Sequence, residues 1–473
     1  MTRQLELVTP DSTTIDLLNG VAQAILHGWQ TQSADFGEQV ESTPFGATVT
    51  IGSAQPIVDT IPLILIGSQV EILAVNGAIE RLLQALRAFT NERSGEQYAL
   101  LRYRSAVQTK AQQAAIYDGA LSYPSDGLVS LLAYDGPESE HQIDATLTLL
   151  RHPFPEDATE KTPVIRQENG VVVVEFPAGG TADGRVTHLQ VSRNSTDGKM
   201  SGLFGGIRPK HAGFDAFRPI WNLYNAIPST ENIFAVENDA AAIGGNYLDV
   251  PHSATEISLY QYIIQLNSDT SVDHQHFHGD YNVLLRYRDG GARYRVTLGK
   301  RYLNRTFKLP PRYIGSDDGV ANNDWQVVNM GRVSFPGIGG RLGSAAYRSQ
   351  GLEIFIKWLN GTQNLWLDAL ILVPAARSLV LDGFHQDLAN TVRYETDVQD
   401  RGRAWSGSDA TNPHESMEEP VLIGGESFYV PSEGGVGVFI VLRDGDDTHI
   451  VHGDGLLDFT LGYVDRYQVL NDQ

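Results

Sequence analysis

The sequence predicts a multidomain, mainly β protein built from β-sandwich or barrel domains, with one amphipathic helix in the N-terminal domain. Short runs of alternating apolar and polar residues, about five to eight long, recur along most of the chain between Gly, Asn, Asp and Pro. Glycine supplies 47 of the 473 residues, as expected for a chain with many turns. At about 100–200 residues per domain, this length favours two to four domains.

The N-terminal region, residues 1–165, contains the predicted helix at 71–93, where apolar residues recur at steps of three and four. The residues that mark this pattern are Ile72, Val75, Ile79, Leu82, Leu83 and Leu86. Predicted strands at 57–67 and 98–104 flank the helix, so we expect it to pack across a small sheet in a β-barrel-like domain. The region ends in a stretch rich in proline and charge at 151–163.

Two further units are predicted from changes in composition. Residues 170–378 form an all-β unit that ends in an apolar run at 368–374. Its clearest alternating segments lie at 283–287, 294–298 and 352–358. Residues 379–473 open with a polar stretch at 386–419, interpreted as a long loop or linker, and continue into a C-terminal β-domain. The predicted strands of that domain cover 427–430, 436–442 and 459–468.

Charge and cysteine content exclude several classes of function. The chain carries 35 basic and 57 acidic residues, a net charge of −22, which argues against general nucleic-acid binding and against adsorption to anionic lipid. With no cysteine, it has no disulfide framework, thiolate zinc site, iron–sulfur cluster or cysteine nucleophile. No secretory signal or membrane-spanning apolar segment is recognisable, so we expect no membrane insertion and release only by assembly or lysis.

Three histidines form one candidate metal site. In an extended strand, alternate side chains share a face, so His274, His276 and His278 could present two or three imidazoles to zinc or a similar ion. The alternative is a polar loop whose histidines are half exposed.

An acidic loop is a second candidate. Asp317, Asp318 and Asp324 collect the oxygen ligands that Ca²⁺ takes, although their spacing is not that of an EF-hand. Asp, Asn and Gly are also the usual residues of turns, and this alternative stays open. Apart from Ca²⁺, we expect no cofactor.

No catalytic motif is recognisable, and the expectation is that the protein is not an enzyme. A glycosidase needs two carboxylates across a cleft, and 57 acidic residues do not nominate a pair. Trp325, between a polar loop and the apolar residues Val327 and Val328, has two interpretations. It stacks on a sugar ring, or it plugs the end of a sandwich.

Four short motifs in the middle region occur in a recognisable order. They are NDAAAIGGNY at 238–247, GDYNVLLRYR at 279–288, DWQVV at 324–328 and LWLDALILVP at 365–374. This order resembles jelly-roll carbohydrate-binding modules of the type appended to glycoside hydrolases. The resemblance covers about 230–375 and implies a jelly-roll β-sandwich within 170–378. It also implies sugar contact by a loop Trp or Tyr, which would be Trp325 and Tyr247 here. Ile243 replaces the serine that is usual in the first motif.

The flanking regions resemble structural proteins of tailed bacteriophages, of the distal tail or baseplate type. The resemblance lies in the strand–helix–strand order at 60–104, in ATLTLLR at 145–151 and in LDFTLGYVDRY at 457–467. It implies a ring of identical copies formed by the first domain, with later β-domains projecting outward. The implied partners are tail-tube and baseplate proteins and a host-surface glycan. The implied location is the virion tail, assembled in the host cytoplasm, and no catalytic residue is implied.

Two alternatives of other classes remain. One is a non-viral carbohydrate-binding protein, or an accessory domain of a glycan-degrading system. The other is a glycan-cleaving enzyme.

For a ring protein, the net charge of −22 would have a use, because DNA passing through a tail channel should not adhere to its wall.

Overall fold

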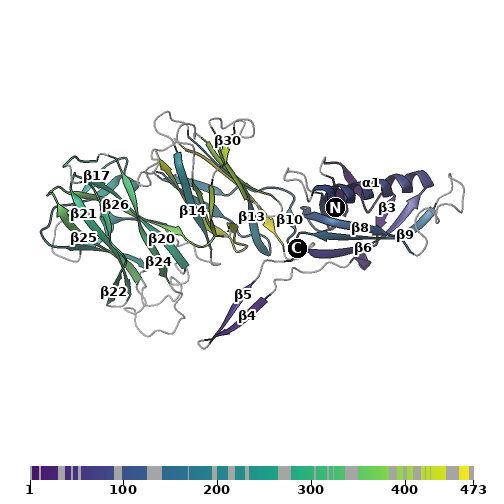
Figure 1. The fold of residues 1–473 in the computed structure, drawn as a ribbon, viewed down its shortest axis with the longest axis horizontal. Helices are drawn as coiled ribbons and strands as arrows, with labels where there is room; N and C mark the ends of the chain where they lie inside the picture. Colours follow the sequence, from purple (N-terminus) through teal and green to yellow (C-terminus); the bar gives the residue numbers. More distant parts are fainter. Residues whose placement is uncertain are drawn as a thin grey trace.

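The computed structural model is mainly β, as predicted, with one α-helix in the part of the chain that it describes. The described residues are 3–9, 12–29, 38–43, 46–51, 55–89, 99–124, 141–168, 170–193, 200–210, 219–228, 234–264, 279–302, 305–316, 319–322, 324–335, 350–382, 391–397, 402–407, 417–420, 422–426, 428–443 and 457–467. Three hydrophobic cores follow one another along an elongated molecule, and each belongs to one domain. Figure 1 shows the N-terminal domain at one end, a sandwich in the centre and a second sandwich at the other end.

The N-terminal domain is one sheet in the order β2-β1-β7-β8-β9-β6-β3, with a helix packed against it. Its strands are β1 (Gln4–Val8), β2 (Thr14–Asp16), β3 (Ala22–Ala24), β6 (Ile57–Gly67), β7 (Leu100–Arg104), β8 (Gln112–Ser122) and β9 (His141–Arg151), and a short 3-10 turn, η1, covers Leu26–Gly28. Burial alternates along β6 and β9, because alternate side chains of a strand point to opposite faces. The first half of β8 pairs with β7 and the second half with β9, so this strand joins the two halves of the sheet.

The helix α1 (Gln69–Phe89) confirms the predicted helix, with a start two residues earlier than the sequence pattern indicated. Its N-terminus is capped by Ser68, whose backbone N–H and hydroxyl donate to Glu71 Oε2 over 2.9 and 2.7 Å. This Ser-x-x-Glu arrangement is a capping box, which satisfies groups left unpaired at a helix start. The apolar side of α1 lies in the core of the N-terminal domain through Ile72, Ile79, Leu82, Leu83 and Leu86.

A separate hairpin belongs to the same region. Strands β4 (Glu38–Thr43) and β5 (Gly46–Ile51) pair with each other in antiparallel register and, among the described residues, with no other strand. Figure 1 shows this hairpin extending away from the body of the molecule.

The central sandwich is assembled from two distant parts of the chain. One layer has the order β10-β34-β13-β28-β29-β30, with β32 also on β13, and the other has the order β11-β12-β33-β14-β27-β31. The strands are β10 (Glu156–Asp157), β11 (Val164–Glu168), β12 (Val171–Phe176), β13 (Ala182–Arg193), β14 (Met200–Pro209), β27 (Ser378–Asp382), β28 (Thr391–Thr396), β29 (Gly402–Gly407), β30 (Met417–Pro420), β31 (Leu422–Glu426), β32 (Tyr429–Val430), β33 (Gly435–Arg443) and β34 (Leu457–Arg466). The short strand β10 pairs with both β8 and β34, so the sheet of the N-terminal domain continues into the central sandwich.

The distal sandwich is inserted between β14 and β27, which are paired neighbours in the central sandwich. Its two sheets have the orders β17-β18-β26-β20-β24 and β16-β19-β25-β21-β22, with β15 on β26 and β23 on β21. The elements are β15 (Ile220–Asn222), η2 (Leu223–Asn225), β16 (Ile227–Pro228), β17 (Ala235–Asn238), η3 (Ile243–Gly245), β18 (Asn246–Val250), β19 (Ile257–Ile264), β20 (Gly279–Asp289), β21 (Arg293–Tyr302), β22 (Arg305–Lys308), β23 (Arg312–Ile314), β24 (Gln326–Phe335), β25 (Gln350–Asn360) and β26 (Leu365–Pro374). The core between these sheets contains Tyr281, Tyr294 and Trp358.

Strand pairing corrects two sequence-based predictions. The predicted unit 170–378 combines strands of both sandwiches, since β12, β13 and β14 pair with β33 and β34 near the C-terminus. The predicted linker at 386–419 contains β28, β29 and the start of β30. Its polar composition was misleading because β28 and β29 bury only part of their residues, such as Val392, Tyr394 and Ala404.

Candidate functional site

The four motifs of the distal sandwich meet in one cluster around two buried ionic side chains. Arg286 of β20 is paired with Asp368 of β26, and both side chains have 0% exposure. Asp368 also accepts the backbone N–H of Ile243 over 3.1 Å, and Arg286 Nη2 donates to the carbonyl oxygen of Ala241 over 3.0 Å. These contacts tie the turn that precedes β18 to the centre of the sheet. Burial raises the pKa of Asp368 to about 6 despite the neighbouring guanidinium.

The same turn requires glycine. Gly244 and Gly245 have φ angles of +74° and +75°, in the left-handed region that other residues rarely adopt. A Cβ atom at Gly244 would also lie 2.6 Å from the side chain of Asn222. The Gly-Gly-Tyr motif is therefore explained by backbone geometry.

Trp325 is part of this cluster and has 1% exposure. Its indole N–H donates to Asp239 Oδ2 over 3.2 Å, and the guanidinium of Arg288 lies 4.4 Å from the centre of its ring. Arg288 also pairs with Asp239 Oδ2 at 2.8 Å and lies 5.5 Å from the ring of Tyr247. Tyr247 meets Trp325 edge to face, with ring centres 5.6 Å apart.

These contacts decide between the two interpretations of Trp325. Its ring is covered on all sides, as in the plugging interpretation, and presents no open face to a sugar. Tyr247 is half-buried beside it. Glycan contact by Tyr247 stays a prediction.

Most of the residues predicted to bind a metal ion lie outside the part of the chain that the structure describes. His274, His276, His278, Asp317 and Asp318 lie outside the described residues. Asp324 is exposed, and its backbone N–H donates to Asn322 Oδ1 over 3.0 Å in a turn. Within the described ranges, no three His, Asp or Glu side chains are placed to share an ion. Ca²⁺ binding stays a prediction.

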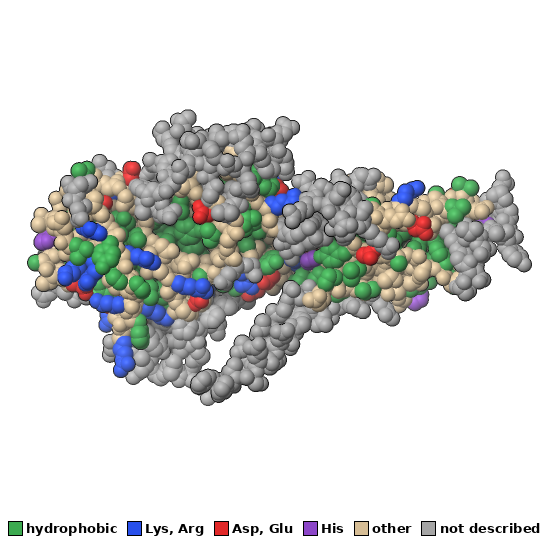
Figure 2. Space-filling view, in the orientation of Figure 1, with side chains coloured by type: hydrophobic (Ala, Val, Ile, Leu, Met, Phe, Trp, Pro, Cys, Tyr) green, Lys and Arg blue, Asp and Glu red, His purple; other side chains and the backbone are tan. Residues whose placement is uncertain are grey.

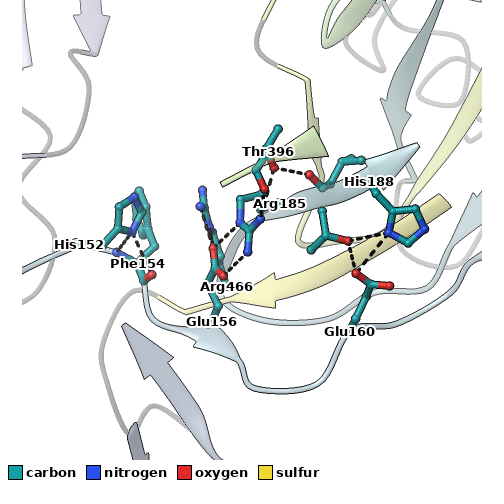
Figure 3. Close-up of polar contacts among 10 residues, drawn as sticks. His152, Phe154, Glu156, Glu160, Arg185, His188, Thr396 and Arg466 are labelled. Carbon is teal, nitrogen blue, oxygen red and sulfur yellow. Dashed lines mark hydrogen bonds and ion pairs between the residues drawn. The ribbon is translucent and has the colours of Figure 1, made fainter. Parts of the chain in front are cut away.

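A second cluster of buried ionic side chains lies where the N-terminal domain meets the central sandwich (Figure 3). Glu156 of β10 accepts from Arg185 of β13 over 2.7 Å at each oxygen, and from Arg466 of β34 over 2.8 Å. All three side chains are at most 8% exposed. Burial alone would raise the pKa of Glu156, but the hydrogen bonds and charges of the two arginines outweigh it and hold the pKa below its usual value.

Neighbouring polar contacts extend this cluster on both sides of β10. Asp157 accepts a hydrogen bond from the Tyr467 hydroxyl over 2.9 Å, and Lys161 forms ion pairs with Asp157 and Asp465. On the side of the N-terminal domain, Arg151 of β9 is paired with Asp59 of β6, and both side chains have 0% exposure. We call Glu156, Arg185, Arg466 and these neighbours the polar junction.

The sequence did not predict the polar junction. Its one local signal is the Glu156-Asp157 pair inside the proline-rich stretch 151–163, which was interpreted as a domain boundary. The arginines that pair with Glu156 lie 29 and 310 residues away, so only the tertiary structure brings the three together.

Both clusters consist of side chains that contact one another. In each, the acidic groups already accept hydrogen bonds from arginine or backbone N–H groups, and a reacting group would have to displace those contacts.

No helix among the described residues is long and apolar enough to cross a membrane.

No protein-family model and no curated protein matches the chain. Among solved structures, it is similar to the baseplate of phage P2 in its activated conformation with calcium, at 10% identity and a TM-score of 0.21, over 78% of this chain and 98% of that chain. It is also similar to the Dit protein of phage SPP1, described as a paradigm of hub adsorption apparatus in phages that infect Gram-positive bacteria, at 9% identity and a TM-score of 0.25, over 77% and 98% of the two chains. A xylan-binding domain is similar over 38% of this chain and 97% of its own, at 13% identity and a TM-score of 0.20. These structures belong to the two classes that the sequence resembles. Their TM-scores are too low to support a conclusion about function, so the function is argued from the residues of this chain.

Proposed function

We propose that the protein is a structural component of the tail of a phage or phage-like particle, in which copies assemble into a ring through the N-terminal domain. The observation that carries the proposal is the hairpin β4–β5, which pairs with no other strand among the residues that the structure describes. A two-stranded ribbon is at best marginally stable alone in water, and its outer edges leave backbone N–H and C=O groups unpaired. A neighbouring copy would supply the missing contacts. If each copy donates one hairpin and receives one, such head-to-tail contacts give a ring when the rotation from copy to copy closes.

The order of the domains supports the same proposal. Figure 1 shows α1 with the N-terminal domain at one end of the molecule and the distal sandwich at the other. The hairpin extends away from the region where the N-terminal domain meets the central sandwich. In a ring built by the N-terminal domains, the distal sandwich would project outward, where it would meet a host-surface glycan. Tail-tube and baseplate proteins would bind the ring itself, and the assembled location would be the virion tail. The proposal needs no catalytic residue and no cofactor.

Electron microscopy and mass photometry of the purified full-length chain test the ring. We expect closed rings of one size, and we expect deletion of residues 38–51 to give monomers with an unchanged circular-dichroism spectrum. As a matched control, alanine at the exposed residue Val107, in another loop of the N-terminal domain, should leave the rings intact. A wild-type chain that stays monomeric at every concentration would contradict the proposal.

A free carbohydrate-binding protein is the second candidate, favoured by the β-sandwich architecture of the distal sandwich. It predicts a monomer that binds glycan without any assembly. Glycan binding by monomeric wild type, together with hairpin deletion that changes neither mass nor binding, would favour this candidate over the tail component.

A further inference from the structure

The distal sandwich carries almost no net charge, although the chain as a whole is strongly acidic. Residues 219–375 contain 13 Lys and Arg against 14 Asp and Glu, so the rest of the chain carries nearly all of the net charge of −22. Residues 293–312, which span β21, β22 and β23, contain seven basic residues and no acidic one. Figure 2 shows Lys and Arg atoms gathered, with apolar atoms among them, at the end of the molecule where Figure 1 places these strands.

One row of side chains on this sheet combines an aromatic ring with two cations. Arg295 of β21 lies directly opposite Lys357 of β25 on one side and Tyr313 of β23 on the other. Because directly paired residues point to the same face, all three side chains share the face opposite to Tyr294 and Val296, which lie in the core. The ring of Tyr313 is 59% exposed, the Arg295 side chain is 35% exposed, and Lys357 is exposed. Adjacent strands lie about 4.8 Å apart, so this row of three side chains spans about 10 Å.

Two more cations extend this face along the strands. The Lys308 ammonium lies 3.5 Å from the centre of the Phe355 ring, and the Arg301 guanidinium lies 4.8 Å from the centre of the Tyr260 ring. Arg301 is six residues beyond Arg295 on the same face of β21, a distance of about 20 Å. We call Arg295, Arg301, Lys308, Lys357, Tyr313, Phe355 and Tyr260 the basic face.

The contacts within the protein do not neutralise the basic face. Glu256 accepts from both Arg295 and Lys308, over 2.9 and 3.0 Å, so this carboxylate serves two cations. Glu353 also lies on this face, but it is buried and accepts from the hydroxyls of Ser258 and Thr306. Lys357 has no acidic partner among the residues that the structure describes, and it stands opposite Arg295. Like charges at directly paired positions destabilise a sheet. The stability of the fold therefore does not explain why a lysine occupies position 357, whereas the binding of an external anion would explain it.

We propose that the basic face binds an anionic polysaccharide. The exposed ring of Tyr313 offers a surface for the CH groups of a sugar, and the adjacent Arg295 and Lys357 can receive the acidic group of that sugar or of its neighbour. The length of the face along β21 accommodates several consecutive residues of an extended polymer. The strongly acidic remainder of the chain repels such a polymer, so long-range electrostatics orient the molecule with its distal sandwich toward an anionic surface.

The inference rests on the projecting-domain part of the proposed function and is independent of ring formation. Binding of the full-length chain to polygalacturonate, a polymer of acidic sugars, tests it by isothermal titration calorimetry, with neutral dextran as the reference polymer. At about 50 mM salt we expect binding to polygalacturonate and none to dextran, and we expect weaker binding as salt shortens the screening length below ~10 Å. Polygalacturonate binding without rings in the microscope would refute only ring assembly, and rings without polygalacturonate binding would refute only this inference.

Substitutions locate the binding. The double variant Arg301→Ser/Lys357→Ser should weaken binding about tenfold, the equivalent of ~1.4 kcal/mol, and Tyr313→Ser about threefold. The matched control Arg3→Ser/Arg81→Ser removes two exposed cations from the N-terminal domain and should change affinity less than about twofold, because those charges lie beyond the screening length. The inference is overturned if wild type does not bind polygalacturonate, if the control pair weakens binding as much as the test pair, or if single-stranded poly(dT) binds as tightly as the polysaccharide.

Discussion

The two junctions that connect the three domains use different chemistry. Between the N-terminal domain and the central sandwich, Glu156 is held by Arg185 and Arg466, with hydrogen bonds of fixed direction. Between the two sandwiches lies a fourth hydrophobic core, in which Val171, Val438 and Ile371 are completely buried. We call this second contact the apolar junction.

The two junctions differ in how strictly they orient the parts they connect and in how their stability depends on pH. Hydrogen bonds between charged groups need one geometry, so the polar junction fixes β10, the strand that pairs with both β8 and β34, on the central sandwich. Apolar packing has no directional requirement of this kind, but it removes area from water and does not depend on the titration of its own side chains. At the apolar junction, the geometry is restricted by the close approach of two backbones. A Cβ atom on Gly206 of β14 would lie 2.0 Å from the carbonyl oxygen of Pro374 in β26.

The largest effect is expected from Glu156→Ala, because it leaves two buried arginines without their carboxylate. Removing one partner of a buried ionic group costs about 3–5 kcal/mol of unfolding free energy. Urea unfolding monitored in the N-terminal domain and the central sandwich would measure the loss. The control Glu160→Ala removes a carboxylate that is 45% exposed and pairs with His188, and it should cost less than about 1 kcal/mol. Equal costs for the two variants would show that the polar junction does not stabilise the fold.

At the apolar junction, Ile371→Ala should cost about 2–5 kcal/mol, because it removes buried methyl groups and leaves a cavity. Val380→Ala is the matched control, since the Val380 side chain is 40% exposed. The cost of Ile371→Ala should be the same at pH 7 and pH 5. A strong dependence on pH would contradict the assignment of this junction to packing alone.

A smaller net effect is expected from acid, because two buried carboxyl groups act in opposite directions. The folded-state pKa of Glu156 lies below its ordinary value of 4.5, so its contribution to stability is present above pH 4.5 and is lost as the pH falls through the folded-state pKa. The pKa of Asp368 is raised from 3.8 to about 6, so its contribution is present below pH 3.8 and is lost as the pH rises through 6.

Calorimetry at several pH values can separate these two contributions. Between pH 7 and pH 5 we expect the distal sandwich to gain stability in the wild type and to show no such gain in Asp368→Asn, which does not titrate. As the pH falls below 4.5, the attachment of β10 to the central sandwich should weaken, because Glu156 loses its charge as the pH falls through its folded-state pKa. Identical pH profiles for wild type and Asp368→Asn would refute the role of Asp368.

The smallest effect is expected from Arg332→Ser. Its ion pair with Asp280 has a length of 2.8 Å, similar to the contacts of Glu156, but the two side chains are 50% and 37% exposed. Exposed pairs contribute about 0–1 kcal/mol, so thermal unfolding should shift little. A loss as large as that of Glu156→Ala would show that burial is not what distinguishes the polar junction.

The sequence determined the individual elements well where a local pattern specifies them. The three- and four-residue spacing predicted α1 because one face of that helix packs on a single sheet. Residues 57–67 were predicted as a strand, and β6 covers the same range. The prediction was weaker for β26, whose apolar run was interpreted as the end of a domain. It is a central strand buried on both faces, with Ala369, Ile371 and Val373 in one core and Leu370 and Leu372 in the other.

Which strands belong together was decided only by the tertiary structure. The distal sandwich interrupts the central sandwich between two paired strands, and no composition break marks where β14 leaves that sandwich. The break predicted at 378/379 falls at β27, where the chain returns, but it does not show that β27 pairs with β14. The same holds for Glu156, Arg185 and Arg466, because an ion pair between residues 310 positions apart has no local signature. The amino-acid sequence by itself fixed the period of each element and the charge of each segment. Only folding determined which of those segments face one another, because burial and pairing depend on contacts between distant parts of the chain.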